Sequence, residues 1–396
     1  MEPKLKRTYK KKPRHQTKKL TPNSVKKIRV YPCKQLHRIW KQWLAAYRWI
    51  YNWTMAQLKS GSNQSAFNLQ SLARGSERPD WVKELPGHQL QEAVADAVDA
   101  YKQAKKNGGD GKFKSCRSYS QVIKFKVGNF KNGTWYQRTT KNLPFSSKQI
   151  VPSQCEYGTQ LVYQKGKWYG CFPEYVETSP TDQEKVIALD PGIRTFLTGY
   201  DGEIALEIGK KDIGRINRLC SHLDQLMSKI SLSKSKRQRY KQRQAATRIR
   251  EKIRHLIKDL HNKVASFLVN NYKIIFLPTF ESSQMVLKQK RRIKSKTARN
   301  MLSFSFYKFA QHLTQMAKRK NCLVVRCNES YTSKTCPECG IIHEKLGSSK
   351  YFKCPSCNYQ FGRDLNGARN IMIRALQATA FTISGNAIHL ISDIQL

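Results

Sequence analysis

The chain has 396 residues, which is enough for two or three domains with buried cores of their own. Its 73 lysines and arginines against 27 acidic residues give a formal net charge of +46, which indicates a phosphate-rich partner, because nucleic acids gain affinity when basic side chains release their counterions. No apolar run approaches the roughly 18 residues that span a bilayer, so no membrane partner is expected. No signal-peptide pattern opens the chain, so we expect a reducing, intracellular compartment.

Residues 1–23 are predicted to form a basic arm. The stretch KLKRTYKKKPRHQTKK at 4–19 has no apolar face, which is typical of a disordered segment. Such an arm either clamps phosphate as a solvated tail or acts as a nuclear localisation signal. A short strand is predicted at 25–30, and Pro32 ends it.

An amphipathic helix is predicted from Lys34 onward, because apolar residues recur there at spacings of three and four. An aromatic stripe of this kind indicates a buried core more often than a platform for a ligand. Residues 59–80 are predicted to be a polar loop, and residues 89–106 a second helix. The stripe consists of Leu36, Trp40, Trp43, Leu44, Tyr47, Ile50 and Tyr51.

Residues 119–178 change to the alternating pattern of strands, at 120–127, 160–164 and 167–172. The sequence QKGK at 164–167 predicts a hairpin turn between the last two. Together with the strand near Val25, they predict a small β-barrel made of residues 24–33 and 119–180. A helical insert at 34–118 interrupts this barrel, whose basic residues suit a nucleic-acid surface.

The second half predicts an α/β domain formed by residues 181–335 and 358–378. Its elements follow the order of the ribonuclease H fold: three hairpin-linked strands, helix, strand, helix, strand, helix. Residues 379–396 are weakly patterned and are expected to be a tail. The predicted strands lie at 186–190, 195–200, 203–208, 273–277 and 323–326, and the helices at 212–271, at 304–318 and after Asp364.

Two cysteine pairs predict a structural zinc site in a ribbon at 336–357, inserted before the last helix. Cys336 and Cys339 form one C-x-x-C turn, and Cys354 and Cys357 form the other. The fourteen residues between the pairs fall just short of the usual spacing, but Gly347 allows a short hairpin. A thiol redox site is the alternative, although doubled C-x-x-C pairs more often bind metal.

Two aspartates suit metal-dependent hydrolysis of phosphodiesters. Asp190 ends a predicted strand, and Asp364 lies at the start of the last helix, where it could also be a simple helix cap. Two-metal hydrolysis needs carboxylates from separate elements that converge on two Mg²⁺ ions about 3.5–4 Å apart. One ion activates water and the other stabilises the leaving oxygen. A third carboxylate is expected from a neighbouring strand.

Three motifs resemble those of the TnpB family of transposon-encoded RNA-guided nucleases, which is related to Fanzor proteins and type V CRISPR effectors. They are IALDPG at 187–192, YTSKTCPECG at 331–340 and CPSCNYQFGRDLNGARN at 354–370. The resemblance spans residues 24–378. It implies a wedge β-barrel with inserted recognition helices, followed by a RuvC-like nuclease domain with the zinc ribbon.

The same resemblance implies the partners and the location. It implies a guide RNA of the omega type, a short target-adjacent motif, and cleavage of both strands of double-stranded DNA by one site with Mg²⁺. One protein molecule is expected in each ribonucleoprotein. The bacterial cytoplasm is the expected location, or the nucleus if the host is eukaryotic or viral.

The second carboxylate departs from the commonest family pattern. Many TnpB proteins have an I-x-x-E-D-L type motif at the end of the fourth strand, whereas this chain has IIFLPTF, with Pro278 at that position. Family members with LPxF and a glutamate just before TSKTC resemble this chain, and by that match Glu329 is the ligand. Glu281 is the alternative, and Glu329 would then merely pair with a lysine such as Lys334.

A basic segment at 288–299 has no apolar stripe and is predicted to contact the backbone of guide or target strands. The alternative is a solvated loop. Its basic residues are Lys288, Lys290, Arg291, Arg292, Lys294, Lys296 and Arg299.

Three functions remain open at this point. The first is an RNA-guided, metal-dependent DNA endonuclease. The second is a nuclease-dead, RNA-guided DNA-binding regulator, which would retain guided target DNA in Mg²⁺ without cutting it. The third is a DNA transposase or recombinase with a ribonuclease H-like core, which would give strand-transfer products.

Overall fold

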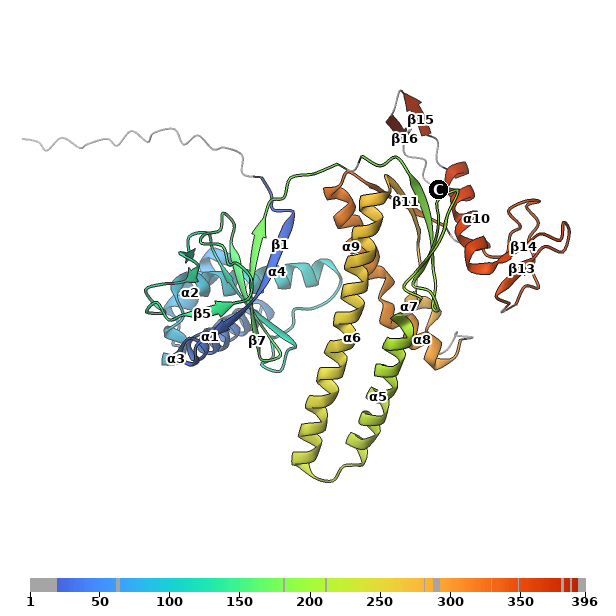
Figure 1. Ribbon diagram of the computed structural model, residues 1–396. Coiled ribbons are helices and arrows are strands. Elements are labelled where there is room, and N and C mark those ends of the chain that lie inside the picture. Colours follow the sequence, from blue (N-terminus) through green and yellow to red (C-terminus); the bar gives the residue numbers. More distant parts are fainter. Residues whose placement is uncertain are drawn as a thin grey trace, which may run out of the picture. The chain divides into compact units, whose positions relative to one another are not determined.

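The computed structural model describes residues 20–61, 65–180, 182–210, 212–280, 282–287, 293–328, 330–347, 349–378, 381–384 and 387–390. The chain divides into two compact units, one ending at Val176 and the other beginning at Glu177 (Figure 1). Nearly all of the predicted basic arm lies outside the described residues. Within the described ranges, no helix has both the length and the apolar character needed to cross a membrane.

The first unit contains an antiparallel sheet of five strands in the order β2-β6-β7-β1-β5. β1 pairs with β7 from Ser24 to Val30, which confirms that the N-terminal strand joins strands far along the chain. The described pairs leave β2 and β5 at the two ends, so they form an open sheet where a closed barrel was predicted. The strands are β1 (Ser24–Pro32), β2 (Ser120–Phe125), β5 (Phe145–Ser147), β6 (Thr159–Gln164) and β7 (Lys167–Glu174), with a small hairpin of β3 (Phe130–Lys131) and β4 (Thr134–Trp135).

The turn between β6 and β7 has the predicted hairpin geometry. Lys165 and Gly166 both have positive φ angles, of 47° and 76°. Two consecutive residues in that region match the right-handed twist of the flanking strands. Gln164 and Lys167 are accordingly paired across the turn.

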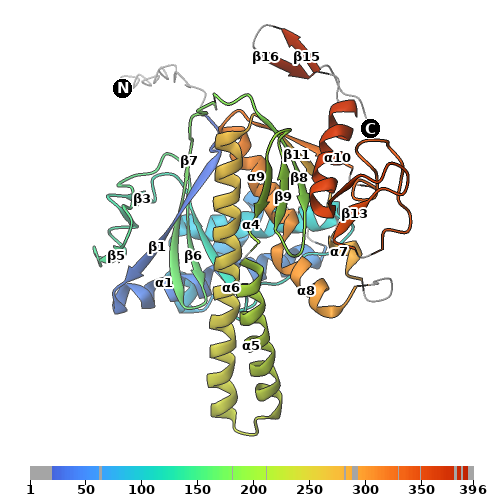
Figure 2. The same cartoon turned by 45° about the vertical axis from the view of Figure 1, so that its right-hand side comes forward.

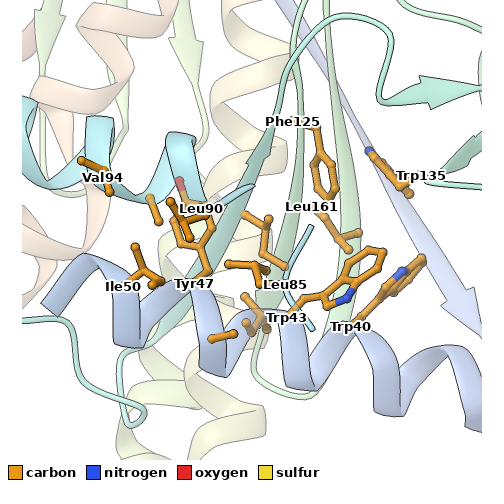
Figure 3. Packing of buried hydrophobic residues seen from close by; sticks show 14 of the residues in the cluster. Trp40, Trp43, Tyr47, Ile50, Leu85, Leu90, Val94, Phe125, Trp135 and Leu161 are labelled. Carbon is orange, nitrogen blue, oxygen red and sulfur yellow. The ribbon is translucent and has the colours of Figure 1, made fainter. Parts of the chain in front are cut away.

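The helices of the first unit bury the predicted aromatic stripe. Figure 3 shows Trp40, Trp43 and Tyr47 among residues of the sheet and of a second helix. All seven residues of the stripe are buried, which confirms that it forms a core. The helices are α1 (Lys34–Lys59), α2 (Ala66–Gly75), α3 (Asp80–Lys83) and α4 (Gly87–Lys106).

The prediction of a polar loop at 59–80 was wrong, because α2 lies within it. The hydroxyl of Ser65 accepts a hydrogen bond from the Asn68 amide at 3.2 Å and caps the helix. Leu69 and Ala73, four residues apart, are fully buried. Packing against the rest of the unit thus stabilises a helix whose own apolar pattern is short.

The second unit is built on a mixed sheet in the order β10-β9-β8-β11-β12. β8, β9 and β10 are antiparallel neighbours, while β11 runs parallel to both β8 and β12. All five strands lie where the sequence predicted them. They are β8 (Val186–Pro191), β9 (Leu197–Tyr200), β10 (Ala205–Ile208), β11 (Ile274–Pro278) and β12 (Leu323–Cys327).

Helices cover both faces of this sheet, as Figures 1 and 2 show. Ile187 and Leu189 of β8 pack in the cluster that includes α5, α6 and α9, whereas Ala188 packs against α10 on the other face. This alternation along β8 determines which face carries each side chain. The helices are α5 (Asp212–Leu232), α6 (Lys236–Asn271), α7 (Ser282–Met285), α8 (Ser295–Phe304), α9 (Phe306–Arg319) and α10 (Arg363–Ala378).

Two small hairpins complete the second unit. β13 (Tyr351–Lys353) and β14 (Gln360–Gly362) belong to the cysteine ribbon, and β14 leads directly into α10. β15 (Phe381–Ser384) and β16 (Ala387–Leu390) form a hairpin within the segment that the sequence predicted to be a weakly patterned tail. The sequence did not predict this hairpin.

Candidate functional site

Asp190 lies near the carboxyl end of β8, in the centre of the second sheet. It is paired in register with Thr198 of β9. Because side chains alternate along a strand, Asp190 shares a face with Ala188, which packs against α10. A rigid central strand therefore directs this carboxylate toward α10.

Asp364 lies in the first turn of α10, which begins at Arg363. It is thus inside the helix and is not the cap residue that precedes it. The side chain is exposed. A carboxylate in the first turn interacts favourably with the positive end of the helix dipole.

Gly367 leaves room for Asp190 to approach the first turns of α10, where Asp364 lies. A Cβ atom at residue 367 would lie 2.5 Å from Oδ2 of Asp190, so the Asp190 carboxylate rests against the bare helix backbone. Gly367 follows Asp364 by three residues, and residues three apart lie on the same side of a helix. Both carboxylates therefore lie at the first turns of α10. Oxygen donors of this kind are those that Mg²⁺ prefers, so the pair fits a divalent cation.

Sequence reasoning missed Gly367, although a signal was present. Glycine inside a helix costs about 1 kcal/mol relative to alanine. An interior glycine in an otherwise good helix therefore indicates a packing or functional reason. Here that reason is the approach of Asp190.

Replacing Gly367 with alanine is expected to displace the Asp190 carboxylate. The added methyl group would overlap Oδ2, and neither the strand nor the helix backbone can move freely. Because a shift of about 1 Å can lower a rate by about 100-fold, a loss of that order is expected in the metal-dependent hydrolysis of phosphodiesters that the sequence predicts. Single-turnover cleavage kinetics would measure it.

Gly214→Ala is the matched control. Gly214 lies in the first turn of α5, and no described atom lies within 4 Å of a Cβ placed there. The control is expected to keep full activity and to gain up to about 1 kcal/mol in stability from helix propensity. Equal activity of Gly367→Ala and Gly214→Ala would show that the Asp190 contact is irrelevant to the reaction.

The third carboxylate stays a prediction. β11 pairs with β8 at Phe276 and Ala188, and the same register continued by two residues places Pro278 beside Asp190. Pro278 is in turn paired with Cys327 of β12. Glu281 and Glu329 follow these two residues in the chain, and both lie outside the described residues.

The four predicted zinc ligands converge. The sulfur atoms of Cys336, Cys339, Cys354 and Cys357 all lie within 4.8 Å of one another. Cys336 and Cys357 are 3.6 Å apart at sulfur, and Cys339 and Cys354 are 3.5 Å apart. Zinc–sulfur bonds of about 2.3 Å in a tetrahedron place sulfurs about 3.8 Å apart. The cluster therefore fits one zinc ion.

The backbone around each cysteine pair is shaped for thiolates. Gly340 and Asn358, each directly after the second cysteine of a pair, have φ angles of 76° and 58°. The amides of Ser356 and Cys357 donate to Cys354 Sγ at 3.4 and 3.5 Å. Donation from Cys357 and Ser356 lowers the pKa of Cys354 to about 6, which favours the charged form that binds metal.

The basic segment is only partly described. Lys288, Lys290, Arg291, Arg292 and the side chain of Lys296 lie outside the described residues. Lys294 is exposed and directly precedes α8. The segment is therefore helical from Ser295 onward and not a loop throughout.

Arg299 differs from the rest of the predicted segment, because it forms an ion pair with Asp224 of α5. Its charge is therefore partly neutralised within the protein.

A larger basic surface lies in the very basic helical region at 212–271, for which the sequence predicted no nucleic-acid contact. α5 and α6 form a long hairpin (Figure 2), and residues 225–250 hold nine lysines and arginines and no acidic residue. Ser235 separates the two helices and caps α6 by accepting from the Gln238 amide. The charge run itself was the signal that could have identified this surface.

Comparisons with known proteins match both halves of the second unit. A family model described as "Probable transposase" matches residues 171–289, and one described as "Cas12f1-like, TNB domain" matches residues 306–371. A TnpB-like protein of Acanthamoeba polyphaga mimivirus is 26% identical over 384 residues, which cover 88% of this chain and 72% of that protein. InsQ of Escherichia coli K12, named "Putative RNA-guided DNA endonuclease", is 25% identical over 325 residues, covering 74% and 75%.

A solved structure is similar over most of the chain at low identity. It is the complex of Cas12f1 with a guide RNA and target DNA, seen by cryo-electron microscopy. The match covers 89% of this chain and 99% of that one, with 17% identity and a TM-score of 0.33.

Proposed function

The chain belongs to the TnpB family, and from this premise we propose that it is an RNA-guided, metal-dependent DNA endonuclease. The observation that supports this most directly is the contact of the Asp190 carboxylate with Gly367, one helical turn from Asp364. Two carboxylates at one place on a strongly basic molecule offer the oxygen donors that a divalent cation prefers. The net charge of +46 suits RNA and DNA as partners.

The division of the chain into two units supports the following domains, which we propose. The second unit is proposed to be a ribonuclease H-like, RuvC-type nuclease at 181–335 and 358–378, because its central strand and last helix carry the two aspartates. Residues 336–357 are proposed as its zinc ribbon. Residues 24–33 and 119–180 are proposed as the wedge domain, with recognition helices at 34–118.

Asp190 and Asp364 are proposed to hold Mg²⁺. Bound divalent cations would supply Lewis-acid activation of the scissile phosphate and of the attacking water. The chain's own contribution is to keep one carboxylate on a rigid strand and the other on a helix packed against it, so that little reorganisation is needed at the moment of reaction. Cleavage of both strands of double-stranded DNA next to a short target-adjacent motif is proposed from the family.

Glu329 is proposed as the third carboxylate. It follows Cys327, whose neighbour Pro278 has no carboxylate to offer, and Cys327 packs on the α10 face of the sheet. Family members with LPxF and a glutamate just before TSKTC resemble this chain, and by that match Glu329 supplies the ligand. Glu329→Gln is therefore expected to lower Mg²⁺-dependent cutting of guided DNA by orders of magnitude, as the loss of a metal ligand does.

Glu281→Gln serves as the paired variant in the same assay. It is expected to cut at nearly the rate of the parent protein. Loss of cutting only in Glu281→Gln would overturn the assignment of Glu329. Full activity in both variants would place the third ligand elsewhere.

Nucleic-acid contact is proposed for two basic surfaces. One is the segment Lys288, Lys290, Arg291, Arg292, Lys294 and Lys296, with Arg299 contributing less because of its pair with Asp224. The other is the tip of the α5–α6 hairpin, where Lys234, Lys236, Arg237, Lys241 and Arg243 are exposed. Contacts of these lysines and arginines with the phosphate backbone of nucleic acid do not depend on its bases, so these surfaces are compatible with a guide RNA and with target DNA of any sequence.

The test is to sequence RNA that copurifies with the protein and then to assay matched DNA with Mg²⁺. One structured RNA species with one variable end, and cleavage of DNA that matches this end, is the expected result. A heterogeneous mixture of cellular RNA and no cleavage of matched DNA would contradict the proposal.

Two other functions remain as outcomes of that assay. Matched DNA that is retained but not cut in Mg²⁺ would indicate an RNA-guided regulator without nuclease activity. The description of one matching family model as a transposase keeps a DNA-joining activity as the second candidate. Strand-transfer products from labelled donor DNA would support it.

A further inference from the structure

Helix α10 packs against the sheet on one face and is hydrogen-bonded to the cysteine ribbon on another. One face, with Ala368, Ile371, Met372 and Ala375, is buried, and three of these residues pack with strands of the sheet. Asp364 precedes Ala368 by four residues, so it lies on that face. Five polar residues lie outside this buried face at spacings of three and four, and each is bonded to the segment 330–359: Arg363, Asn366, Arg369, Asn370 and Arg374.

Asn366 and Asn370 form the buried centre of the polar face. The Asn370 amide donates to the carbonyls of Thr332 and Thr335, both at 2.8 Å, and the Asn366 amide donates to Thr335 O at 3.0 Å. Asn366 is 0% exposed and Asn370 is 7% exposed. Buried amides committed to main-chain carbonyls specify a geometry, because losing them leaves unpaired buried groups.

The segment that these amides hold leads directly into the zinc cluster. It is a turn in which the amides of Lys334 and Thr335 donate to Tyr331 O, and Tyr331 has a φ angle of 63°. A tyrosine in the left-handed region needs support from its surroundings. Cys336 follows at once, so the turn and the first zinc ligand are held together.

Arginines on the same face hold the rest of the ribbon. Arg369 pairs with Glu338, between the first two cysteines, at 3.0 Å and donates to the hydroxyl of Tyr359 at 3.0 Å. Arg363 donates to Gly347 O at 2.8 Å in the connecting loop. The ribbon is thus bonded to α10 at its entry, at both cysteine pairs and at its loop.

We propose that Asn366 and Asn370 are positioning residues that lock the zinc ribbon onto α10 and thereby fix Asp364 relative to Asp190. This inference rests on the proposed nuclease function. β14 runs straight into α10 through Gly362, which has no side chain to cap the first turn. The first turn of a helix frays when its amides lack partners, and here the Arg363 amide finds one in the ribbon, where it donates to Lys350 O at 2.9 Å. The ribbon is bonded to the following turns of α10, and these bonds keep the first turn, and Asp364 with it, in place.

A purely structural role would have a different signature. If the two asparagines only stabilised the fold, their loss would lower DNA binding and cutting together. A positioning role lowers cutting and weakens the response to Mg²⁺ while guided binding persists, because the nucleic-acid surfaces are unchanged. Amide hydrogen exchange at residues 363–367 reports the first turn directly and needs no nuclease activity.

The experiment compares Asn370→Asp and Asn366→Asp with the parent protein, each as the full ribonucleoprotein. The new carboxylate cannot donate and would face main-chain carbonyls. Asn271→Asp is the matched control, because the Asn271 amide also donates to a carbonyl, Phe267 O at 2.7 Å, but on the exposed surface of α6.

Asn366→Asp and Asn370→Asp are each expected to change four properties and to keep a fifth. Amide exchange at 363–367 is faster, and zinc passes to a chromogenic chelator sooner. Cutting falls by about 10- to 100-fold, the usual effect of losing a group that orients a metal ligand, and half-maximal cutting needs more Mg²⁺. Guided DNA binding stays within about twofold, since none of the proposed phosphate contacts is touched. Asn271→Asp behaves like the parent.

Unchanged exchange at 363–367 would overturn the inference, and so would a parallel fall in binding and cutting. If Asn370→Asp does not fold, Asn370→Ser, which keeps one donor, is judged by the same measurements. A parent protein that does not cut matched DNA would refute the proposed function instead. Amide exchange and zinc transfer would then still decide whether the hydrogen bonds of Asn366 and Asn370 to the ribbon hold the first turn of α10.

Discussion

Asp190→Ala and Asp364→Ala are each expected to abolish DNA cutting while guided binding stays near that of the parent protein. Each change removes a proposed ligand of Mg²⁺ and no proposed phosphate contact. Losing a metal that activates the nucleophile or stabilises the leaving group costs several orders of magnitude in rate. The measurement is single-turnover cleavage of matched DNA at saturating ribonucleoprotein, with binding followed separately in Ca²⁺.

Asp259→Ala is the matched control for this pair. Asp259 is an exposed carboxylate on α6 whose contact is a surface pair with Lys263 at 2.8 Å. Surface pairs of this type contribute little to stability, so the control is expected to cut normally. Cutting by Asp190→Ala or Asp364→Ala within about tenfold of the parent would remove that residue from the list of direct ligands.

Cys336→Ser or Cys354→Ser is expected to release the zinc and unfold the ribbon. Both cysteines are buried, and a structural zinc site supplies folding free energy directly, about 10–16 kcal/mol in isolated zinc-finger peptides. Because the ribbon is bonded along α10, cutting should fall together with the zinc content. Metal analysis of the purified variants and limited proteolysis near residue 345 would measure both effects.

Cys116→Ser controls for the loss of a thiol as such, because Cys116 is an exposed free cysteine in the first unit. It should retain zinc and activity. A parent protein that contains no zinc after purification without chelators would refute the assignment of the four cysteines. Cutting that survives complete zinc loss would show instead that the nuclease centre does not depend on the ribbon.

Local patterns in the sequence determined much of the fold. The five strands of the second unit, the hairpin turn at Lys165 and Gly166, and the aromatic core of α1 were all predicted from periodicity and turn chemistry. These features depend on residues a few positions apart, so a sequence displays them directly. The four cysteines were found for the same reason, because their chemistry imposes a short spacing within each pair.

Errors arose where contacts far apart in the chain decided the outcome. α2 was predicted to be loop because its apolar face is only Leu69 and Ala73, and packing supplies what its own pattern lacks. The ion pair of Arg299 with Asp224, 75 residues earlier, was likewise not visible in the local sequence pattern. Strand periodicity could not distinguish an open sheet from a barrel, since closure depends on pairing between its ends.

By itself, the sequence determined which residues can do chemistry here: two aspartates at element ends, two candidate glutamates and four cysteines. Only the tertiary structure decided that Asp190 lies near Asp364. Asp190 and Gly367, which is three residues after Asp364, are 177 residues apart and touch only when α10 packs on the sheet. The same holds for the polar face of α10. Asn366 and Asn370 are ordinary helix residues in the sequence, and their function arises from carbonyls that the folded ribbon brings within 3.0 Å.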